Sequence, residues 1–279
     1  MASIEDLSIL KSQIHHPRFM PTYCRKTDLP CFIFSFRLFL LSIFIFSSCH
    51  SPEDQYGLNV SSVKSDTSYK VSFNEILSPV EQQMIRMGLV DVCSEDTSIH
   101  TDIKYSTTDN FLKTDIYGDY NKAYLQPDVA EKLLNAQAFL KELHPGYRLI
   151  IYDAARPVIF QKMIWDSLKM PAREKGKYAC SPSNGSLHNY GAAIDLSILD
   201  DKGKELDMGC PYDFFGPLAY PVMENQLLSE GTLTQQQVDN RKLLRQVMSK
   251  AGFFNIQTEW WHFNSCCRAE AIEKYKGIE

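Results

Sequence analysis

The spacing of hydrophobic residues predicts a long amphipathic helix near the middle of the chain, followed by a buried strand. From Pro127 onward, apolar side chains recur at intervals of three and four residues, which places them on one face of a helix. Gly146 is expected to end this helix. The apolar run 148–153 then predicts a buried strand, and the alternating segment 191–198 predicts a second one.

Capping signals indicate further helices. Ser78 and Thr234 each have a glutamate or glutamine three residues later, and in this pattern the two side chains satisfy free backbone groups at a helix start. Pro157 is suited to the first turn of another helix. The helices predicted from these signals span 78–87, 157–170 and 234–252.

The remaining segments are predicted to be loops and short strands. A strand is expected at 103–105, loops at 171–187 and 217–231, and a closing strand pair at 253–263. Helices and strands mix without the regular alternation of a parallel α/β fold. The predicted fold class is therefore α+β, with a largely antiparallel central sheet flanked by helices.

Composition allows one ordinary domain with a sizeable core and excludes one class of partner. The chain has 279 residues, of which 44% are hydrophobic. Its formal net charge of −5 lacks the concentrated positive charge that nucleic-acid binding needs, so no nucleic-acid partner is expected. Five cysteines follow Cys49 without a C-x-x-C pair. Buried free thiols are the favoured interpretation, and one disulfide is the alternative.

The first part of the chain has the pattern of a bacterial export signal. Basic residues, among them Arg25 and Arg37, precede the apolar run 38–46, and small residues then lead to Cys49. This arrangement resembles the lipoprotein signal, in which the cysteine is lipidated and becomes the new N-terminus. We therefore expect 1–48 to be an N-terminal extension with a lipoprotein-type signal peptide, and Cys49 to carry the lipid.

Export determines where the rest of the chain is expected to lie. Residues 49–77 would form the lipid-anchor cysteine and a polar tether, and 78–279 the folded domain. This domain would lie outside the cytoplasm, on the periplasmic side, and would associate with the membrane through the lipid. A membrane-spanning anchor over 31–48 is the alternative, and Met20 competes with Met1 as the start.

Two histidines and two carboxylates form the strongest chemical signal. His188 and Asp195 stand seven residues apart, and Glu259 and His262 stand three apart near the other end of the chain. A catalytic zinc site needs three protein ligands, an open position for water and a base, and this set can supply them. A buried histidine paired with a structural aspartate is the alternative interpretation.

The same spacings constrain the geometry. Residues seven apart on a regular strand face opposite sides, so His188 is expected in an irregular stretch before Gly191, with Asp195 on the strand that follows. Glu259 and His262 likewise cannot share a face of a flat strand. We expect a bulge or a strand end there.

The order of these motifs resembles that of a known group of peptidases. The pattern Ser-x-His-x-x-Gly-x-Ala-x-Asp at 186–195, with Glu-x-x-His at 259–262, resembles the metal site of zinc D,D-peptidases that act on cell-wall peptides. Further segments are similar to the D-alanyl-D-alanine dipeptidases, the family of the dipeptidase found in vancomycin resistance. These segments are 152–157, 208–215 and 259–263. The similarity extends from about Ser78 to Arg268.

This resemblance implies a role for each residue of the metal site. One zinc ion would be held by His188, Asp195 and His262, with Glu259 as the general base. Arg156 would stabilise the oxyanion of the tetrahedral intermediate. For the arginine, a plain salt bridge to the nearby aspartate of the same motif is the alternative.

Two more residues are implied in substrate binding. Asp213 matches the family position that binds the free α-amino group of the substrate, and Ser186 matches a hydroxyl near the same group. For Asp213, capping of the turn at 214–215 is the alternative.

The implied activity is zinc-dependent hydrolysis of D-alanyl-D-alanine to two D-alanines in cell-wall peptide metabolism. A single zinc-peptidase domain would act on this small dipeptide, and no oligomeric state is indicated. One alternative is a D,D-carboxypeptidase that trims the terminal D-alanine from peptidoglycan stem peptides. Another is a non-catalytic wall-binding lipoprotein. The presence of Glu259 and Arg156 counts against the latter, because a pure binder needs neither.

Overall fold

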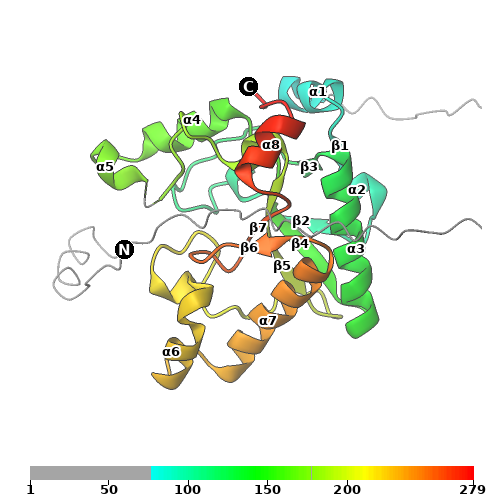
Figure 1. The fold of residues 1–279 in the computed structure, drawn as a ribbon, viewed down its shortest axis with the longest axis vertical. Coiled ribbons are helices and arrows are strands. Elements are labelled where there is room, and N and C mark those ends of the chain that lie inside the picture. The colour runs from blue at the N-terminus through cyan, green and yellow to red at the C-terminus, as the bar shows by residue number, and fades with distance from the viewer. Residues whose placement is uncertain (1–76, 177) are drawn as a thin grey trace, which may run out of the picture. The chain divides into compact units, whose positions relative to one another are not determined.

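In the computed structural model of the chain, a five-stranded sheet organises the part that is described, residues 77–279 apart from residue 177 (Figure 1). In spatial order its strands are β2 (His100–Thr101), β4 (Arg148–Asp153), β5 (Ala193–Leu199), β7 (His262–Asn264) and β6 (Phe254–Asn255). β2 and β4 are parallel, and the other neighbouring pairs are antiparallel. The prediction of an α+β fold with a largely antiparallel sheet is confirmed.

The predicted export signal, Cys49 and most of the tether lie outside the described residues. Within 77–279, no helix combines the length and the apolar character that a membrane span requires.

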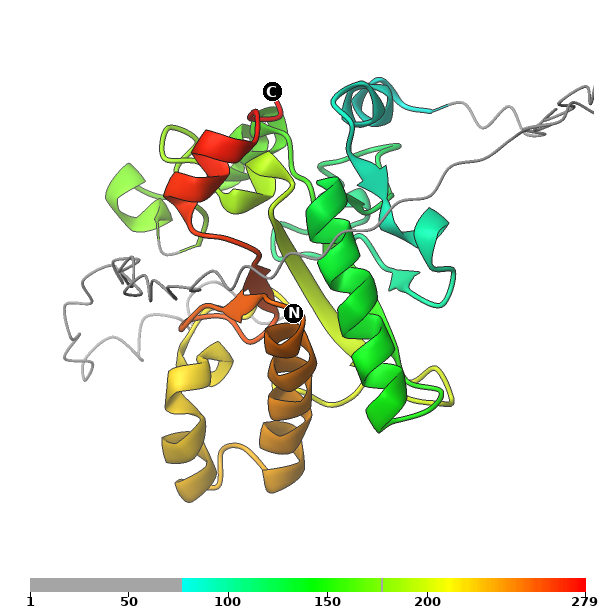
Figure 2. The ribbon, with the colours of Figure 1, turned by 45° about the vertical axis from the view of Figure 1, so that its right-hand side comes forward.

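Helices of very different lengths surround the sheet. They are α1 (Pro79–Arg86), α2 (Val92–Glu95), α3 (Pro127–Leu143), α4 (Val158–Ser167), α5 (Ala172–Lys175), α6 (Glu224–Ser229), α7 (Gln235–Lys250) and α8 (Arg268–Lys274). The short 3-10 helices are η2 (Lys104–Ser106), η3 (Leu187–Tyr190), η4 (Pro217–Ala219) and η5 (Pro221–Met223). A separate antiparallel pair joins β1 (Val90–Asp91) to β3 (Tyr124–Leu125). α3 and α7, the two longest helices, lie side by side next to the sheet (Figures 1 and 2).

The apolar stripe predicted for α3 forms the contact between this helix and the rest of the core. Val129, Leu133, Ala136 and Leu140 are fully buried, and the helix packs against β4 and α7. Burial of each leucine side chain stabilises the fold by about 1.5–3 kcal/mol. Leu143, the last residue of the predicted stripe, is 47% exposed because the helix ends there.

Both predicted capping boxes are present. The hydroxyl of Ser78 accepts a hydrogen bond from the backbone N–H of Glu81 at 3.2 Å, and the glutamate in turn accepts from the backbone of Ser78. Thr234 and Gln237 make the same reciprocal pair at the start of α7. These caps explain why the starts of α1 and α7 were predictable to the residue.

The strand predicted at 103–105 is wrong. The strand residues lie earlier, at His100 and Thr101, and the segment 104–106 is a 3-10 helix. The turn is closed by the backbone N–H of Ser106, which donates to the carbonyl of Ile103 at 3.1 Å. Apolar character at 103–105 therefore reflects burial in a turn rather than strand pairing.

Three helix and loop predictions also need correction. α4 ends at Ser167 rather than near residue 170, and the next residue, Leu168, already has an extended backbone conformation. The predicted loop 171–187 contains α5. The predicted loop 217–231 contains α6. Two 3-10 turns that begin with proline precede this helix, and its start has no side-chain cap.

Candidate active site

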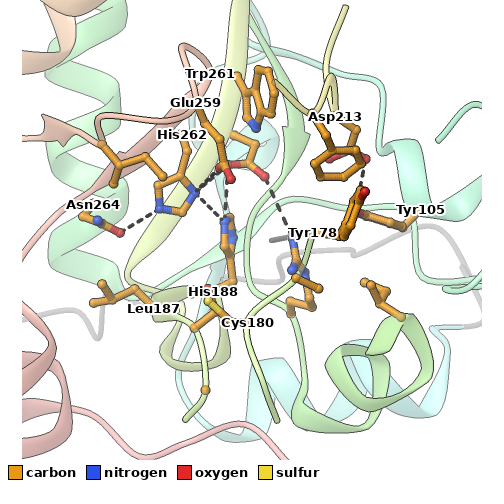
Figure 3. A pocket seen from close by; sticks show the side chains of 18 of the residues that line it. Tyr105, Tyr178, Cys180, Leu187, His188, Asp213, Glu259, Trp261, His262 and Asn264 are labelled. Atoms are coloured by element: carbon orange, nitrogen blue, oxygen red, sulfur yellow. Dashed lines mark hydrogen bonds and ion pairs between the residues drawn. The ribbon is translucent and has the colours of Figure 1, made fainter. Parts of the chain in front are cut away.

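Three side chains converge in a pocket beside the central sheet (Figure 3). His188 comes from η3, Asp195 from β5 and His262 from the first position of β7, and all three are buried. Asp195 Oδ1 lies 3.3 Å from His188 Nε2 and 2.9 Å from His262 Nδ1, and the two nitrogens are 3.2 Å apart. These atoms all lie within 4.8 Å of one another and can hold a metal ion together.

The local fold explains how distant residues meet. Asp195 and His262 are directly opposite each other in the antiparallel register of β5 and β7, so their side chains share one face of the sheet. His188 approaches from outside the strand, as expected, because the chain reverses at Gly191. This glycine has φ of +63°, and a Cβ there would lie 3.0 Å from a methyl carbon of Leu89. His262 stands at a strand end, which was one of the two expected geometries.

Hydrogen bonds behind the two imidazoles fix which nitrogen faces the centre. His188 Nδ1 lies 2.6 Å from the carbonyl oxygen of Ala154, which can only accept, so Nδ1 carries a proton and Nε2 is the nitrogen that faces the centre. The side-chain oxygen of Asn264 accepts from His262 Nε2 at 2.9 Å, which directs Nδ1 toward Asp195 as the nitrogen that would bind a metal. Sequence reasoning missed Asn264. Its position two residues after His262, on the same face of a strand, is the signal that could have found it.

The electrostatics of the site favour a bound cation. Burial opposes ionisation of Asp195, yet the two imidazoles hold its pKa well below its usual range. Burial alone would lower the pKa of His262, but the hydrogen bond and the charge of Asp195 raise it to about 9. Two nitrogens aimed at one carboxylate oxygen thus form a set that binds a proton strongly when no metal is present.

Asp195 has a further partner that sequence reasoning missed. The hydroxyl of Tyr212 donates to Asp195 Oδ2 at 3.1 Å. The two histidines lie closest to the other carboxylate oxygen, Oδ1. The tyrosine lies within the 208–215 segment that resembled the peptidase family, where no role had been assigned to it. This bond fixes the rotation of the carboxylate.

Glu259 lies at the edge of the same cluster. Its Oε2 is 3.9 Å from His262 Nδ1, and 37% of the side chain remains exposed. The surrounding protein and the charge of Asp195 raise the pKa of Glu259, although the nearby imidazole opposes the shift. A carboxylate with a raised pKa that still reaches the pocket can exchange protons with a water molecule there.

Arg156 makes the salt bridge that was the alternative interpretation and also lines the pocket, while its oxyanion role stays a prediction. It is ion-paired with Asp153, with Nε 2.8 Å from Oδ2, and it also lines the pocket, with Nη2 3.9 Å from Asp195 Oδ2. Its Nη1 donates to the side-chain oxygen of Gln161 at 2.9 Å. Gln161 is fully buried and was not identified from the sequence. The guanidinium is therefore held from behind while part of it faces the pocket.

Asp213 and Ser186 line the same pocket, whose volume is about 260 Å³. Burial and the charge of Asp195 raise the pKa of Asp213 well above its usual range, and Tyr105 OH donates to its Oδ2 at 3.1 Å (Figure 3). The hydroxyl of Ser186 accepts from the backbone N–H of His188 at 3.3 Å. Ser186 thus also caps η3, a structural role that the sequence interpretation did not include.

Comparison with known proteins finds relatives that all carry the same name. The chain is 31% identical over 175 residues to the D-alanyl-D-alanine dipeptidase of Escherichia coli (strain K12), covering 63% of this chain and 83% of that protein. It is 28% identical over 182 residues to the dipeptidase of the same name from Enterococcus faecium, covering 59% and 85%. The corresponding protein of Synechocystis is 27% identical over 168 residues, covering 50% and 68%.

Two further findings complete the comparison. Among solved structures, the peptidoglycan-recognising LD-carboxypeptidase LdcB overlaps with a TM-score of 0.34 and 22% identity, over 55% of this chain and 70% of that one. The model of the D-Ala-D-Ala dipeptidase family of peptidases matches residues 86–275, which contain every residue of the pocket described above. The chain belongs to the D-Ala-D-Ala dipeptidase family.

Proposed function

We propose that this protein hydrolyses D-alanyl-D-alanine to two D-alanines, with one zinc ion bound by His188, Asp195 and His262. One observation carries the proposal: the three candidate ligand atoms, all within 4.8 Å of one another, share a pocket with Glu259 and Arg156. The relatives supply the substrate, because they are named D-alanyl-D-alanine dipeptidases.

The donor set fits zinc. Two imidazole nitrogens and one carboxylate oxygen are suitable ligands for catalytic zinc, which keeps a fourth position open. The pKa of about 9 for His262 supports this fit, because it reflects the attraction of these atoms for positive charge. When bound, zinc polarises a carbonyl oxygen and lowers the pKa of water.

Glu259 is the proposed general base. Its partial exposure allows contact with a water molecule in the pocket, and its raised pKa makes it a stronger base than an ordinary glutamate. The same carboxyl group then passes this proton to the leaving amine of the second D-alanine. Glu259 would thus act first as the general base and then as the general acid.

Arg156 is the proposed partner of the oxyanion that develops on the scissile carbonyl. The ion pair with Asp153 and the bond to Gln161 hold the guanidinium in place before the substrate arrives. Donors that are fixed in advance stabilise a charge that appears only in the transition state, because little energy is spent on reorienting them.

Asp213 is the proposed partner of the substrate's α-ammonium group, and Ser186 lies near the same end of the pocket. This assignment favours a dipeptidase over a D,D-carboxypeptidase. A stem peptide has a neutral amide where the dipeptide has an ammonium group, so it would leave the partly buried carboxyl group of Asp213 without a counter-ion.

We also propose that the protein is exported and anchored through a lipid on Cys49, with the dipeptidase domain on the periplasmic side. The support is the sequence alone: basic residues, the apolar run 38–46 and small residues directly before the cysteine. In this location the domain would meet dipeptides derived from the cell wall.

The decisive experiment measures D-alanine release from D-alanyl-D-alanine by the full-length protein, together with its zinc content. We expect one zinc per chain, loss of activity on chelation and recovery on adding zinc. Glu259→Gln should keep the zinc and lose about 10²–10⁴-fold in turnover. Glu270→Gln, on the exposed surface of α8, is the matched control and should match the wild type.

Two outcomes would contradict the proposal. Full activity after exhaustive chelation would exclude the metal from the reaction. Normal turnover by Glu259→Gln at normal zinc content would assign the base to another residue.

A further inference from the structure

The loop Met208–Leu218 brings two side chains to the site but has little regular structure of its own. It carries Tyr212, which contacts Asp195, and Asp213, which lines the pocket. Between residues 208 and 216 the loop contains no helix or strand. Asp213 has φ of +58°, a conformation that residues with a side chain rarely adopt. Contacts from outside the loop must therefore stabilise this geometry.

One arginine of α7 supplies contacts at both ends of the loop. Arg241 Nε donates to the carbonyl oxygen of Met208 at 2.6 Å, and Nη2 donates to the carbonyl oxygen of Leu218 at 2.9 Å. Nη2 also lies 3.6 Å from the sulfur of Cys210. The side chain of Arg241 is completely buried. A single rigid guanidinium thus connects the first and last residues of the loop.

Neighbouring residues on the same face of α7 hold the segment that leads into the loop. Gln237 Nε2 donates to Asp207 Oδ2 at 2.9 Å, and Asn240 Nδ2 donates to the carbonyl oxygen of Asp207 at 2.8 Å. Positions 237, 240 and 241 lie on one side of a helix because they are three and four residues apart. The N-terminal half of α7 is therefore built to seat this loop.

The charge of Arg241 is not used in a close ion pair. Its Nη1 lies 3.7 Å from Glu224 Oε1, whereas Arg245 Nη1 donates to the same oxygen at 2.8 Å. Glu224 is therefore neutralised mainly by Arg245, and the hydrogen bonds of Arg241 go to the loop. Burial of a guanidinium costs free energy, and here its hydrogen bonds to the main-chain carbonyls of the loop offset part of that cost.

We propose that Arg241 is a positioning residue for the amine-binding end of the pocket. By connecting the two ends of the 208–218 loop, it fixes Asp213 relative to the metal ligands at the separation that a free dipeptide requires. Arg241 thereby determines discrimination against substrates whose α-amine is blocked, without touching the substrate. This inference rests on the proposed dipeptidase function.

The test compares two arginine-to-methionine variants of the same helix. For each full-length protein, kcat/KM is measured for D-alanyl-D-alanine and for its N-acetyl derivative, with zinc content and thermal unfolding as accompanying measurements. Arg241→Met should keep the zinc, raise KM for the free dipeptide more than it lowers kcat, and reduce the ratio of the two kcat/KM values about tenfold or more. Arg245→Met is the matched control, because it removes the main partner of Glu224 but no contact with the loop. It should lose stability and keep the wild-type ratio.

Hydrogen exchange of the peptide that contains residues 209–216 provides a readout that does not depend on activity. Exchange should be faster in Arg241→Met and unchanged in Arg245→Met. If Arg241→Met does not fold, Arg241→Lys is used instead. Its single ammonium keeps the charge but cannot span both carbonyls, so the ratio should still fall and exchange should still rise.

Three results would separate failure of the positioning role from failure of the proposed dipeptidase function. A wild-type ratio and wild-type exchange in folded Arg241→Met, or in Arg241→Lys, would overturn the positioning role. An equal fall of the ratio in Arg245→Met would assign the effect to general loss of stability and would also overturn it. No preference for the free dipeptide in the wild type would refute the proposed function instead, and the exchange measurement would then decide the role of Arg241 in the loop.

Discussion

Replacement of Asn264 by alanine tests whether the hydrogen bonds behind the metal ligands set the affinity for zinc. Asn264 is 8% exposed, and its side-chain oxygen accepts from His262 Nε2 at 2.9 Å. Without this acceptor, nothing on that side keeps the proton on Nε2, so the imidazole can change tautomer or rotate. Nδ1 would then be turned toward the metal position for only part of the time.

The expected magnitude follows from how much of the ligand set changes. Loss of a hydrogen-bond partner behind a ligand typically weakens metal binding by about 10–100-fold. This corresponds to about 1.4–2.8 kcal/mol, since each factor of ten is ~1.4 kcal/mol. His188 keeps its bond to the carbonyl of Ala154 at 2.6 Å, and Asp195 keeps its bond from Tyr212, so we expect weakened rather than abolished binding.

The assay is competition for zinc between the full-length protein and a chromophoric chelator of known affinity. Asn264→Asp is the matched control, because it keeps an oxygen acceptor at the same place and should bind zinc at least as tightly as the wild type. An unchanged affinity in Asn264→Ala, in protein that unfolds at the wild-type temperature, would refute this reasoning. The orientation of His262 would then be set by its strand alone.

Three further predictions concern other parts of the chain. In the wild type, kcat/KM for free D-alanyl-D-alanine should exceed that for the N-acetyl dipeptide by at least ~10²-fold, and Asp213→Asn should reduce this ratio; equal values in the wild type would favour a carboxypeptidase. The pKa of His262 is raised from 6.5 to about 9, so metal-free protein should lose thermal stability as pH rises from 6.5 to 9, and a flat profile in chelator would contradict this. Cys49→Ser should move the protein from the membrane fraction to the soluble fraction, whereas retention through a carbonate wash would support a spanning anchor.

The sequence was most informative where local chemistry alone determines structure. The starts of α1 and α7 were predictable because Ser78 and Thr234 each satisfy free backbone groups within one helical turn. The main residues of the pocket could be predicted together because their motifs resemble those of zinc D,D-peptidases. The odd spacing of seven residues between His188 and Asp195 placed His188 outside the strand of Asp195. The segment 103–105 failed for the opposite reason: its apolar residues are buried in a turn whose partners lie elsewhere in the chain.

Residues that act through long-range contacts could not be identified in this way. An arginine on an amphipathic helix is usually interpreted as a solvent-exposed charge, and nothing near Arg241 in the sequence indicates that it binds carbonyl groups of residues 208 and 218. Gln161 and Tyr212 are similar, because their partners Arg156 and Asp195 become neighbours only when the fold has formed. α6 was missed because it begins without a side-chain cap.

The pairing of β5 with β7 means that the metal ligands are far apart along the chain. Asp195 and His262 are separated by 67 positions, and His188 and His262 by 74. Closing such long segments costs entropy, so the complete ligand set exists only in chains in which β5 and β7 have already paired. An ion that binds only this complete set stabilises the folded state by mass action, in proportion to the logarithm of its free concentration. The supply of metal in the compartment where the chain folds would therefore influence how long the folded protein persists against proteolysis, in addition to its rate of turnover.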